Sequence, residues 1–427
     1  MKPDVTVVGA GVTGLTAAIE AAERGASVTV AEAHSQPGGR ARSLAPPFKA
    51  NAGPHAIYVD GPWWAWLQHR DLTPPVVPAP QAANLVRVAG RLGRWPEGLS
   101  EAIAALPAQA PVQESFRTWL LRHIEARSAE AIIGLVFIAT FDHDPGRLSA
   151  AFAQERLRRA LAGGARYIVG GWTTLVGLLT ERAASLGVRI ETRTRVSALP
   201  AAPTILATTL ATARQLTGDR SLAWPGARVA TFDVGLRADT SPGWFRVMDL
   251  DDRIYAARYS LAEPALAPPG HELIQIAAAC APHERKTDAE RRVQRLLDQS
   301  WPGWRTWVRW HRSSVRVHCT GAIDLPGTTW RDRPGIDRGN NLMVATDQSA
   351  APGLLAETGI ASAQLAAQQL CAHTASHFVP GVSLPPLEAP QSQIPRSPGS
   401  STPSPACPAT SRTPSRAPSA PGRSATR

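Results

Sequence analysis

A β-branched run followed by an alanine-rich run opens the chain. Val5-Thr-Val-Val8 has the residue types of a short buried strand, and Leu15–Arg24 has the apolar spacing of a helix. Ser27–Ala31 repeats the strand pattern and ends at Glu32. A strand, a helix and a second strand within about thirty residues are typical of a parallel βαβ unit. The pattern therefore predicts an α/β fold.

The same pattern returns after a long interruption. Residues 60–160 have the composition of helices and loops rich in Trp, Pro and Ala. The return begins near Tyr167–Leu175 and continues as a helical stretch through Ala184. A strand and turn at 188–196 and a short apolar strand at 204–208 follow. The chain is thus expected to leave the first sheet and come back to it.

The chain is expected to return to the first sheet a second time, before the tail begins. Residues 222–320 alternate apolar and polar positions, which indicates strands of another sheet. The apolar strand 340–346 then ends at Asp347, and an alanine-rich helix follows over 354–372. We expect this last strand and helix to rejoin the first sheet.

These blocks predict a discontinuous arrangement of two domains. A Rossmann-like dinucleotide-binding domain is expected from three stretches, and an α+β substrate domain from the two stretches between them. The end of the chain is rich in Pro, Ser, Ala, Thr and Arg, without apolar periodicity, and is expected to be disordered. The expected boundaries are 1–60, 166–215 and 326–378 for the first domain, 61–165 and 216–325 for the second, and 379–427 for the tail.

The turn between the first strand and helix has the spacing of a dinucleotide-binding loop. It reads Gly9-Ala10-Gly11-Val-Thr13-Gly14. Gly9 permits a tight turn, Gly11 leaves no Cβ where a pyrophosphate approaches, and Gly14 lets the helix pack closely on the strand. All five named positions are predicted to contact or shape the cofactor site, with the diphosphate at the helix N-terminus.

A carboxylate and a second glycine cluster follow this loop. Glu32 stands where an adenosine ribose needs an acceptor. The first loop alone is also compatible with an NAD site or with any tight turn. Gly38-Gly39-Arg40 adds backbone amides and a cation for a phosphate, and Arg42 is a second candidate for a phosphate or the flavin edge. The combination predicts FAD as the cofactor.

Here the sequence resembles a known flavoprotein superfamily. Gly38-Gly39-Arg40-Ala-Arg42-Ser43 is similar to the Gly-Gly-Arg-x-x-Ser segment of amine oxidases, protoporphyrinogen oxidases and phytoene desaturases. The resemblance implies a glutathione-reductase-type FAD-binding domain. It also implies that Val196, after a short strand, binds the adenine through its backbone.

The resemblance extends to the last strand. Similar proteins have Ala-Gly-Asp there, whereas this chain has Ala345-Thr346-Asp347. Asp347 is expected to bind ribityl hydroxyls, with Pro352 and Gly353 leading into a helix whose N-terminus faces the flavin. The alternative for Asp347 is a helix N-cap.

Two residue types differ from the family pattern in this region. Thr346 places a Cβ where glycine is usual, and Ala361-Ser362-Ala363 stands where a Ser-Gly pair is common. Both differences are expected to loosen or reshape the cofactor fit.

His55 is the candidate for a polar group at the flavin ring. It lies in Asn51-Ala-Gly53-Pro-His55-Ala-Ile-Tyr58, which resembles the Gly-Pro-His block of phytoene-desaturase-like proteins. The alternative is a histidine hydrogen-bonded within its own loop. Tyr58 is a weaker candidate.

Lysines and tryptophans bear on the substrate. Amine oxidases of this superfamily often hold a lysine near the flavin, but none of Lys2, Lys49 and Lys286 is a convincing equivalent. Thirteen tryptophans favour an apolar substrate or contact with a membrane surface. The alternative is core packing, which the spacing favours. The tryptophans concerned are Trp63, Trp64, Trp301, Trp304, Trp307 and Trp310.

Composition narrows the class further. The chain has 427 residues and a net charge of +11, which we attribute to arginine bias rather than to nucleic-acid binding, since basic runs with interleaved aromatics are lacking. Cys280, Cys319, Cys371 and Cys407 have no metal-ligand spacing and indicate a reducing compartment. An early first strand and short apolar runs predict a cytoplasmic protein without signal peptide or membrane span.

We therefore expect an FAD-dependent oxidoreductase that oxidises a C–C or C–N bond of a lipophilic small molecule by hydride transfer to flavin N5. One alternative is a redox-neutral flavoenzyme such as an isomerase or mutase. Another is a flavin-binding protein without catalytic activity. Substrate identity, electron acceptor and oligomeric state are left open by the sequence.

Overall fold

The first sheet of the molecule is parallel and has five strands. The computed structural model describes residues 4–238 and 242–376. The strand order is β15-β9-β1-β2-β8, and every pairing is parallel. The strands are β1 (Asp4–Val8), β2 (Ser27–Ala31), β8 (Arg189–Glu191), β9 (Thr204–Leu206) and β15 (Leu342–Val344). The two predicted returns to this sheet are thus present in the structure.

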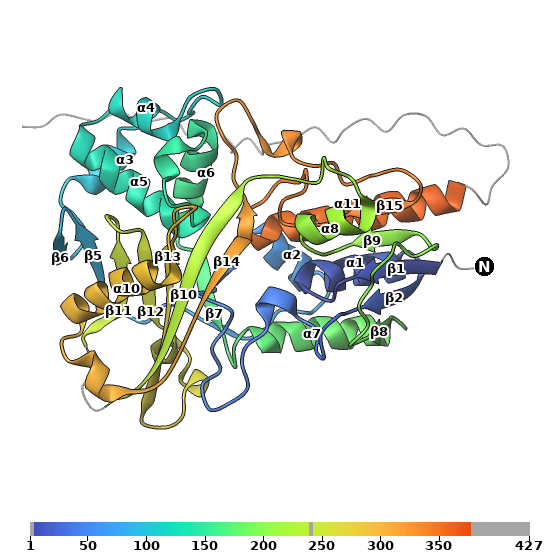
Figure 1. Cartoon of the computed structure of the whole chain (residues 1–427), viewed down its shortest axis with the longest axis horizontal. Helices are drawn as coiled ribbons and strands as arrows, with labels where there is room; N and C mark the ends of the chain where they lie inside the picture. Colours follow the sequence, from blue (N-terminus) through green and yellow to red (C-terminus); the bar gives the residue numbers. More distant parts are fainter. Residues whose placement is uncertain (1–3, 239–241, 377–427) are drawn as a thin grey trace, which may run out of the picture. The chain divides into compact units, whose positions relative to one another are not determined.

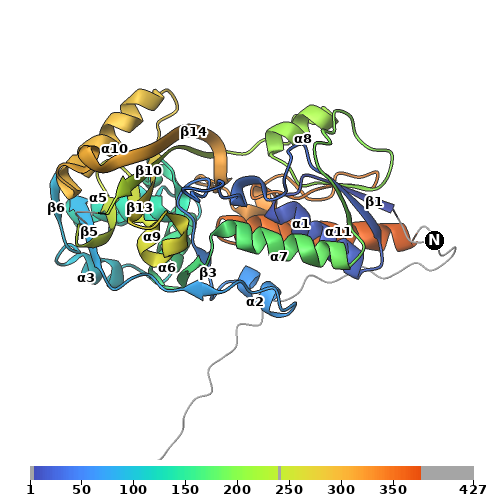
Figure 2. The same cartoon turned by 90° about the horizontal axis from the view of Figure 1, so that it is seen from below.

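Helices cover both faces of this sheet (Figures 1 and 2). On one face, α1 (Val12–Glu23) contacts both α7 (Trp172–Ser185) and α11 (Ala356–Ser376). Val5 and Val7 are buried against these helices, because alternate strand residues point to the same face. On the other face, Val8 packs with α8 (Leu210–Thr217).

The second sheet is mixed and has seven strands, in the order β14-β10-β13-β12-β11-β5-β6. All pairings are antiparallel except that of β11 with β5. The strands are β5 (Ala83–Val88), β6 (Arg91–Gly93), β10 (Gly226–Arg237), β11 (Trp244–Asp249), β12 (Ile254–Arg258), β13 (His271–Ala279) and β14 (Val308–Ala322).

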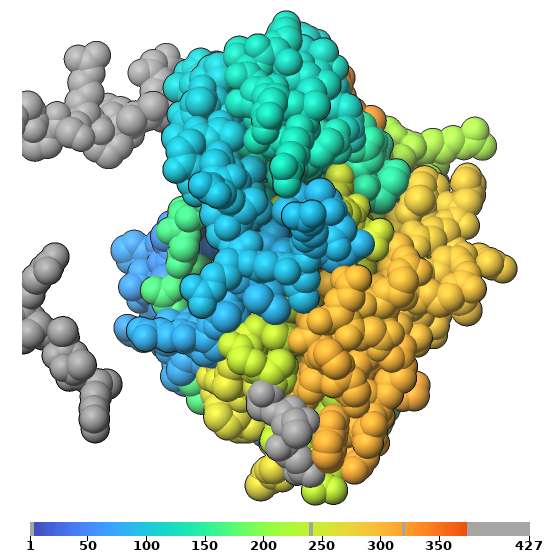
Figure 3. Space-filling view, turned by 90° about the vertical axis from the view of Figure 1, so that its left-hand side faces the viewer, coloured from blue at the N-terminus to red at the C-terminus, as the bar shows by residue number. Residues whose placement is uncertain are grey.

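One face of the second sheet is covered by the helix α10 (Lys286–Ser300). Val293 and Leu297 of this helix pack against Val234 and Ile276 of the strands. Leu85 of β5 packs against the same cluster. Figure 3 views this end of the molecule, where residues near 80–110 and residues near 285–310 form one continuous surface.

Helices and a small sheet lie beside the other face of the second sheet. The helix α5 (Ala126–Thr140) is almost wholly apolar and buried, and Gly134 brings it against Leu250, so that a Cβ there would lie 2.6 Å from the Leu250 carbonyl oxygen. The other elements are α3 (Leu99–Ala104), α4 (Phe116–Leu121), α6 (Ala150–Leu161), α9 (Tyr259–Ala262) and the three-stranded sheet of β3 (Ile57–Tyr58), β7 (Ala165–Ile168) and β4 (Val76–Val77). The helix α2 (Pro62–Gln68) instead contacts α11 and packs into the core beside the first sheet.

The structure confirms the predicted fold class and corrects two local expectations. Residues 83–93 form a strand pair within the stretch expected to hold only helices and loops, because β5 pairs with β11 far along the chain. Trp301–Trp310 is not a helical stripe: α10 ends at Ser300, and after Gly303, at φ 80°, the chain continues as a short 3₁₀ turn and then β14. Trp301 and Trp304 nevertheless pack in the core, as the alternative predicted.

Candidate dinucleotide and active site

Two of the three glycines in the first loop are required by the protein's own packing. Gly9 has φ 102°, and a Cβ there would lie 2.6 Å from the carbonyl oxygen of Ala207. A Cβ on Gly14 would lie 1.8 Å from the Gly9 carbonyl oxygen. Both positions therefore hold α1 close to β1, as the spacing predicts.

Gly11 differs, because nothing in the chain requires it to be glycine. Its backbone is extended, with φ −70° and ψ 175°. The nearest atom to a Cβ there is the Gly39 Cα, at 4.0 Å. The position therefore has the open space that a pyrophosphate needs beside the N-terminus of α1.

The second glycine cluster lies directly against the first. The Gly38 N–H donates to the Ala10 carbonyl at 2.7 Å, and Gly11 and Gly38 form an isolated parallel bridge. Gly38 and Gly39 have φ 116° and 53°, which favour glycine. Arg42 is half-buried and has no hydrogen bond or ion pair within the described part of the chain. Together these residues form a cradle of amides and one uncommitted cation.

Glu32 is held at the end of β2 by backbone amides. Its carboxylate accepts the N–H groups of Ala10 and His34, each at 2.8 Å, and the residue is 5% exposed. The Thr194 N–H donates to the Glu32 carbonyl at 2.8 Å, which brings the segment with Val196 alongside. Val196 itself is half-buried against the cluster around α8.

Asp347 pairs with a residue from the other end of the chain. The Arg40 Nη1 donates to Asp347 Oδ2 at 2.7 Å. The Asp347 carbonyl accepts the Ala322 N–H at 3.1 Å, which joins this turn to the end of β14. Two predicted site residues, 307 positions apart, thus lie at one place.

Thr346 is accommodated without disturbing this turn. It is 3% exposed, and its hydroxyl accepts the Gln348 N–H at 3.0 Å and lies 3.2 Å from the Ser349 hydroxyl. Its carbonyl accepts from Ser362 at 3.0 Å. The side chain therefore points into a local hydrogen-bonded turn, and its effect on the cofactor fit stays a prediction.

Gly359 is a site residue that the sequence reading missed. A Cβ there would lie 2.5 Å from the Thr13 hydroxyl and 3.6 Å from the Asp347 nitrogen. The start of α11 thus approaches Thr13 of α1 closely at Gly359, and Ala363 lies further along, buried in the core that the two helices share.

The segment before α11 is held by a buried arginine. Gly353 has φ 130°, and a Cβ there would lie 2.7 Å from the Thr358 nitrogen, while Pro352 is exposed. The Gly353 carbonyl accepts from Arg156 Nη1 at 2.9 Å and from the Thr358 hydroxyl at 3.0 Å. Arg156 is 4% exposed, and burial lowers the pKa of its guanidinium. No local signal in the sequence singled out Arg156, since α6 carries four other polar residues.

His55 lies on the turn that follows Asn51. Its Nδ1 is 2.7 Å from the Gly53 carbonyl, and its ring meets the Trp172 ring edge-on at 5.2 Å. Burial is the main cause that lowers its pKa; the Gly53 carbonyl opposes this, and the charges of Arg40 and Arg316 add to it. The imidazole is therefore neutral at neutral pH. The hydrogen bond within its own loop, which was the alternative for this residue, is present, and its place at the flavin ring stays a prediction.

All four tyrosines of the chain lie in one cluster beside His55. Tyr167 meets Tyr259 edge-on at 5.3 Å, and Tyr255 interacts with both hydroxyls. Burial raises the pKa of Tyr58 to about 12, with Tyr255 as a second cause. Tyr259 lies against the backbone of His55. Of these four tyrosines, only Tyr58 was a candidate site residue from the sequence.

The lysines among the described residues add no candidate for a lysine near the flavin. Lys286 begins α10 and lies 3.4 Å from Glu290, on the opposite face of the second sheet. Lys49 is half-buried, and its N–H donates to the Leu266 carbonyl. Lys2 lies outside the described residues.

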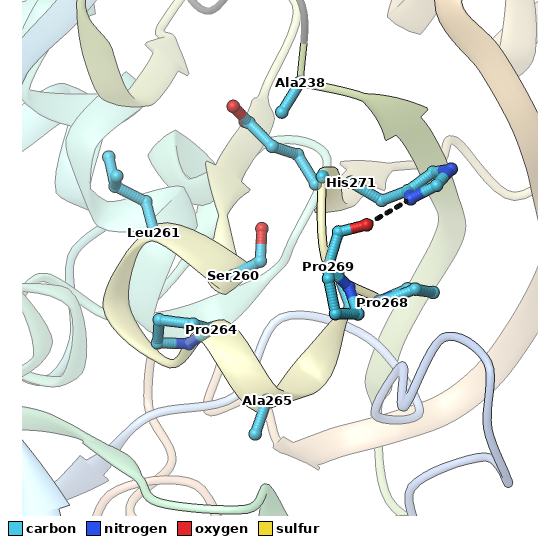
Figure 4. Close-up of a pocket in the computed structure, with 11 residues that line it drawn as sticks. Ala238, Ser260, Leu261, Pro264, Ala265, Pro268, Pro269 and His271 are labelled. Atoms are coloured by element: carbon cyan, nitrogen blue, oxygen red, sulfur yellow. Dashed lines mark hydrogen bonds between the residues drawn. The ribbon is translucent and has the colours of Figure 1, made fainter.

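A hollow of about 520 Å³ lies elsewhere, between α9 and the start of β13 (Figure 4). Its polar groups are already engaged: the Ser260 hydroxyl accepts the Leu273 N–H at 2.8 Å, and His271 Nδ1 lies 3.0 Å from the Pro269 carbonyl. None of the residues that line it is a predicted site residue.

The described residues show neither a candidate metal site nor a candidate membrane span. Within 4–238 and 242–376, no three His, Cys, Asp or Glu side chains are grouped as metal ligands. No helix in these ranges is long and apolar enough to span a bilayer.

Comparison with known proteins shows which solved structures share this fold. Residues 7–69 match the family model of an NAD(P)-binding Rossmann-like domain. An oxidoreductase from Methanosarcina mazei superposes with a TM-score of 0.67 at 19% identity, over 86% of this chain and 100% of that one. Cyclohexylamine oxidase from Brevibacterium oxydans gives 0.66 at 15% identity, over 88% and 100%.

A protein assigned as a protoporphyrinogen oxidase, from an Exiguobacterium species, gives 0.66 at 15% identity, over 87% of this chain and 99% of that one. A comparison with curated proteins gives no match. The chain therefore shares the fold of the amine oxidases and protoporphyrinogen oxidases that its glycine clusters resemble.

Proposed function

We propose that this protein is an FAD-dependent oxidoreductase that oxidises a C–N or C–C bond of a small molecule. The observation that carries the proposal is the open position at Gly11. Its glycine has no role in the fold, yet it faces the Gly38-Gly39 cradle and lies on the same loop as the half-buried Arg42. A dinucleotide diphosphate accounts for all of these features.

The second half of the proposed site favours FAD over a nicotinamide cofactor. The Arg40 and Asp347 pair brings the last strand of the sheet to the Gly-Gly-Arg loop. An NAD site does not require a second loop or a carboxylate at this place. The fold shared with amine oxidases supports the same choice.

Each part of the cofactor has residues that would hold it. Glu32 would accept from the adenosine ribose, the Val196 backbone would meet the adenine, and Arg42 would face the diphosphate. Asp347 would accept from the ribityl chain once Arg40 turns to the phosphate. The amides at the start of α11 would face the pyrimidine ring, where their dipole favours negative charge. When bound there, FAD supplies the hydride acceptor, and dioxygen or a quinone takes the electrons on.

The proton that accompanies the hydride has a candidate acceptor in His55. A carbonyl oxygen only accepts hydrogen bonds, so the Gly53 carbonyl fixes the proton on His55 Nδ1. The lone pair of Nε2 is then free to accept a proton from a substrate amine or an adjacent carbon. This tautomer makes a C–N substrate with an ionisable amine the expected case.

Aromatic side chains would exclude water from this place. Trp172 lies against His55, and Trp63 lies 5.8 Å from Trp172 between ring centres. A dry pocket favours proton and hydride transfer because competing hydration is absent.

The test is the visible absorption spectrum of the purified protein before and after dithionite, with the released cofactor identified by mass. Flavin bands that bleach on reduction, with the mass of FAD, support the proposal. A colourless protein that takes up no FAD on reconstitution contradicts it. A panel of primary and secondary amines, followed by flavin bleaching without oxygen, then tests the reaction class. If no amine bleaches the flavin fully, but a compound whose oxidation gives an unsaturated product does, the oxidised bond is a C–C bond.

A further inference from the structure

The two faces of the second sheet differ in kind. The face against α10 is apolar, with Phe232, Val234, Ile274 and Ile276 packed on the helix. The opposite face turns toward the His55 loop and the tyrosine cluster. Strand register places a row of polar residues across it, since residues directly paired in a sheet share one face. That row is Arg246, Ala257, Gln275, Asp233 and Arg312.

The only carboxylate in that row is neutralised within it. Asp233 is fully buried and accepts from Arg312 Nε at 2.9 Å and from Gln275 Nε2 at 3.2 Å. Arg312 and Gln275 also donate to the Asn51 carbonyl, at 2.6 and 3.1 Å. This network fixes the loop that carries His55, and it leaves no negative charge in excess.

Two arginines on this face are not part of the network. Arg246 and Arg316 have no hydrogen bond or ion pair among the residues that the structure describes, and the Arg246 Nε is shielded from solvent. A guanidinium nitrogen shielded from solvent without an acceptor, as at Arg246, is costly unless a ligand supplies one, whereas Arg316 is exposed and stays hydrated until a ligand binds. The face is therefore electropositive, with two cations free.

Arg316 is the one that lies at the proposed reaction site. Thr231 and Ser314 are paired across β10 and β14, with their hydroxyls 2.9 Å apart. The Thr231 methyl lies 3.1 Å from where a Cβ on Gly53 would be, so the His55 loop crosses this pair. Arg316 follows Ser314 on the same face, one step further along β14.

We propose that the substrate carries a carboxylate, which Arg316 binds beside His55. The inference rests on the proposed function, because it assigns the substrate class of that same site. A guanidinium fork matches a carboxylate with two parallel hydrogen bonds. The tyrosine cluster offers an apolar surface for the rest of the molecule. An acid with an apolar body thus fits better than the fully apolar substrate that the tryptophan count favours.

The experiment is calorimetric titration of the FAD-loaded protein with benzoate and with benzamide, which has the same ring without the charge. We expect benzoate to bind at least about tenfold more tightly than benzamide. Arg316→Gln should abolish that preference, and Arg316→Lys, which keeps the charge but not the fork, should keep part of it. Arg316 is exposed, so neither change is expected to prevent folding.

Arg228→Gln is the matched control. Arg228 is adjacent to the Val229–Arg316 pair across the same two strands, but it points away and donates to the Ala281 carbonyl at 3.1 Å. The Arg228→Gln variant should bind benzoate and benzamide as the unchanged protein does.

Equal binding of the two ligands, absence of binding, or a preference that survives in Arg316→Gln overturns the inference. The absorption spectrum is recorded before the titration. A protein that takes up no flavin counts against the proposed function, whereas a flavin-loaded protein that does not prefer benzoate counts only against this inference.

Discussion

The guanidinium of Arg40 donates to the carboxylate of Asp347 across 2.7 Å, although the two residues are 307 positions apart. Arg40 follows the second glycine cluster and Asp347 follows the last strand of the parallel sheet. Their contact closes the proposed cofactor site at one point. It also gives each residue a partner when no phosphate or ribityl chain is there to bind.

Breaking this pair should weaken cofactor binding more than it weakens the fold. The Arg40 side chain is 43% exposed, so solvent screens the pair, and Asp347→Asn should change the free energy of unfolding of the apoprotein by no more than about 1 kcal/mol. The Kd for FAD should rise at least about tenfold, because ribityl hydroxyls lose a charged acceptor. Thermal unfolding of the apoprotein and fluorescence titration with FAD measure the two effects. An unchanged Kd would remove Asp347 from the site.

Gly11 and Gly14 should respond differently to the same substitution. Gly11→Ala meets no atom of the chain within van der Waals contact, so the apoprotein should fold with nearly unchanged stability but lose FAD. Gly14→Ala places a Cβ 1.8 Å from the Gly9 carbonyl oxygen and should unfold or strongly destabilise the protein. Circular dichroism and flavin content after purification separate the two outcomes. Full flavin content in Gly11→Ala would refute the phosphate cradle.

Glu32→Ala should lower both stability and flavin retention. It leaves the fully buried Ala10 N–H without its acceptor, which costs about 1–3 kcal/mol. Glu191→Gln is a suitable control, since Glu191 ends the neighbouring strand in register with Ala31 and its side chain is 42% exposed. Chemical denaturation of both apoproteins and FAD titration give the comparison. Equal behaviour of the two variants would argue against a role for Glu32 in the ribose site.

His55 should make the protein sensitive to mild acid. Its pKa in the folded state lies below the ordinary value of 6.5, through burial and the charges of Arg40 and Arg316. Above 6.5 the ring is neutral in both states and contributes nothing to the pH dependence. Below it the unfolded chain binds the proton first, so stability is lost as the pH falls through this window.

The measurement is the drop in Tm between about pH 7.5 and about pH 5.5. His55→Asn should show a smaller drop than the unchanged protein, whereas His34→Asn, at an exposed histidine, should show the same drop. If the drop is identical in all three proteins, the neutral-imidazole assignment is wrong.

Arg156 should act on the cofactor through the segment that it holds. Arg156→Met removes a buried donor from the Gly353 carbonyl and should cost about 1–3 kcal/mol in unfolding free energy. The Kd for FAD should rise, and Arg156→Lys should restore part of the affinity. Arg158→Met, at an exposed site on the same helix, should affect neither quantity. A destabilised variant with normal FAD affinity would show that Arg156 is only a packing residue.

Local pattern was sufficient for much of the site. The β-branched run, the glycine spacing and the position of Glu32 predicted the β1 and α1 turn, because strand and helix periodicity and the steric needs of glycine act over a few residues. The same reasoning placed Asp347 at the end of a buried strand. These features depend on neighbours in the sequence, and the structure places them as expected.

Other features were decided only when distant segments met. β5 became a strand because β11 was there to pair with it, and Gly359 gained its role because α11 crosses α1 at Thr13. Four tyrosines that are scattered in the sequence form one cluster. Long-range packing and strand register set these relations, and local periodicity predicts neither of them.

The charge of the proposed substrate surface shows this division most clearly. The sequence determined that Asp233, Arg312 and Arg316 exist on strands with alternating patterns. Only the register of β10 against β14 decided that Asp233 pairs with Arg312 and that Arg316 is left free, because a carboxylate is neutralised by whichever cation the folded chain places within hydrogen-bond distance.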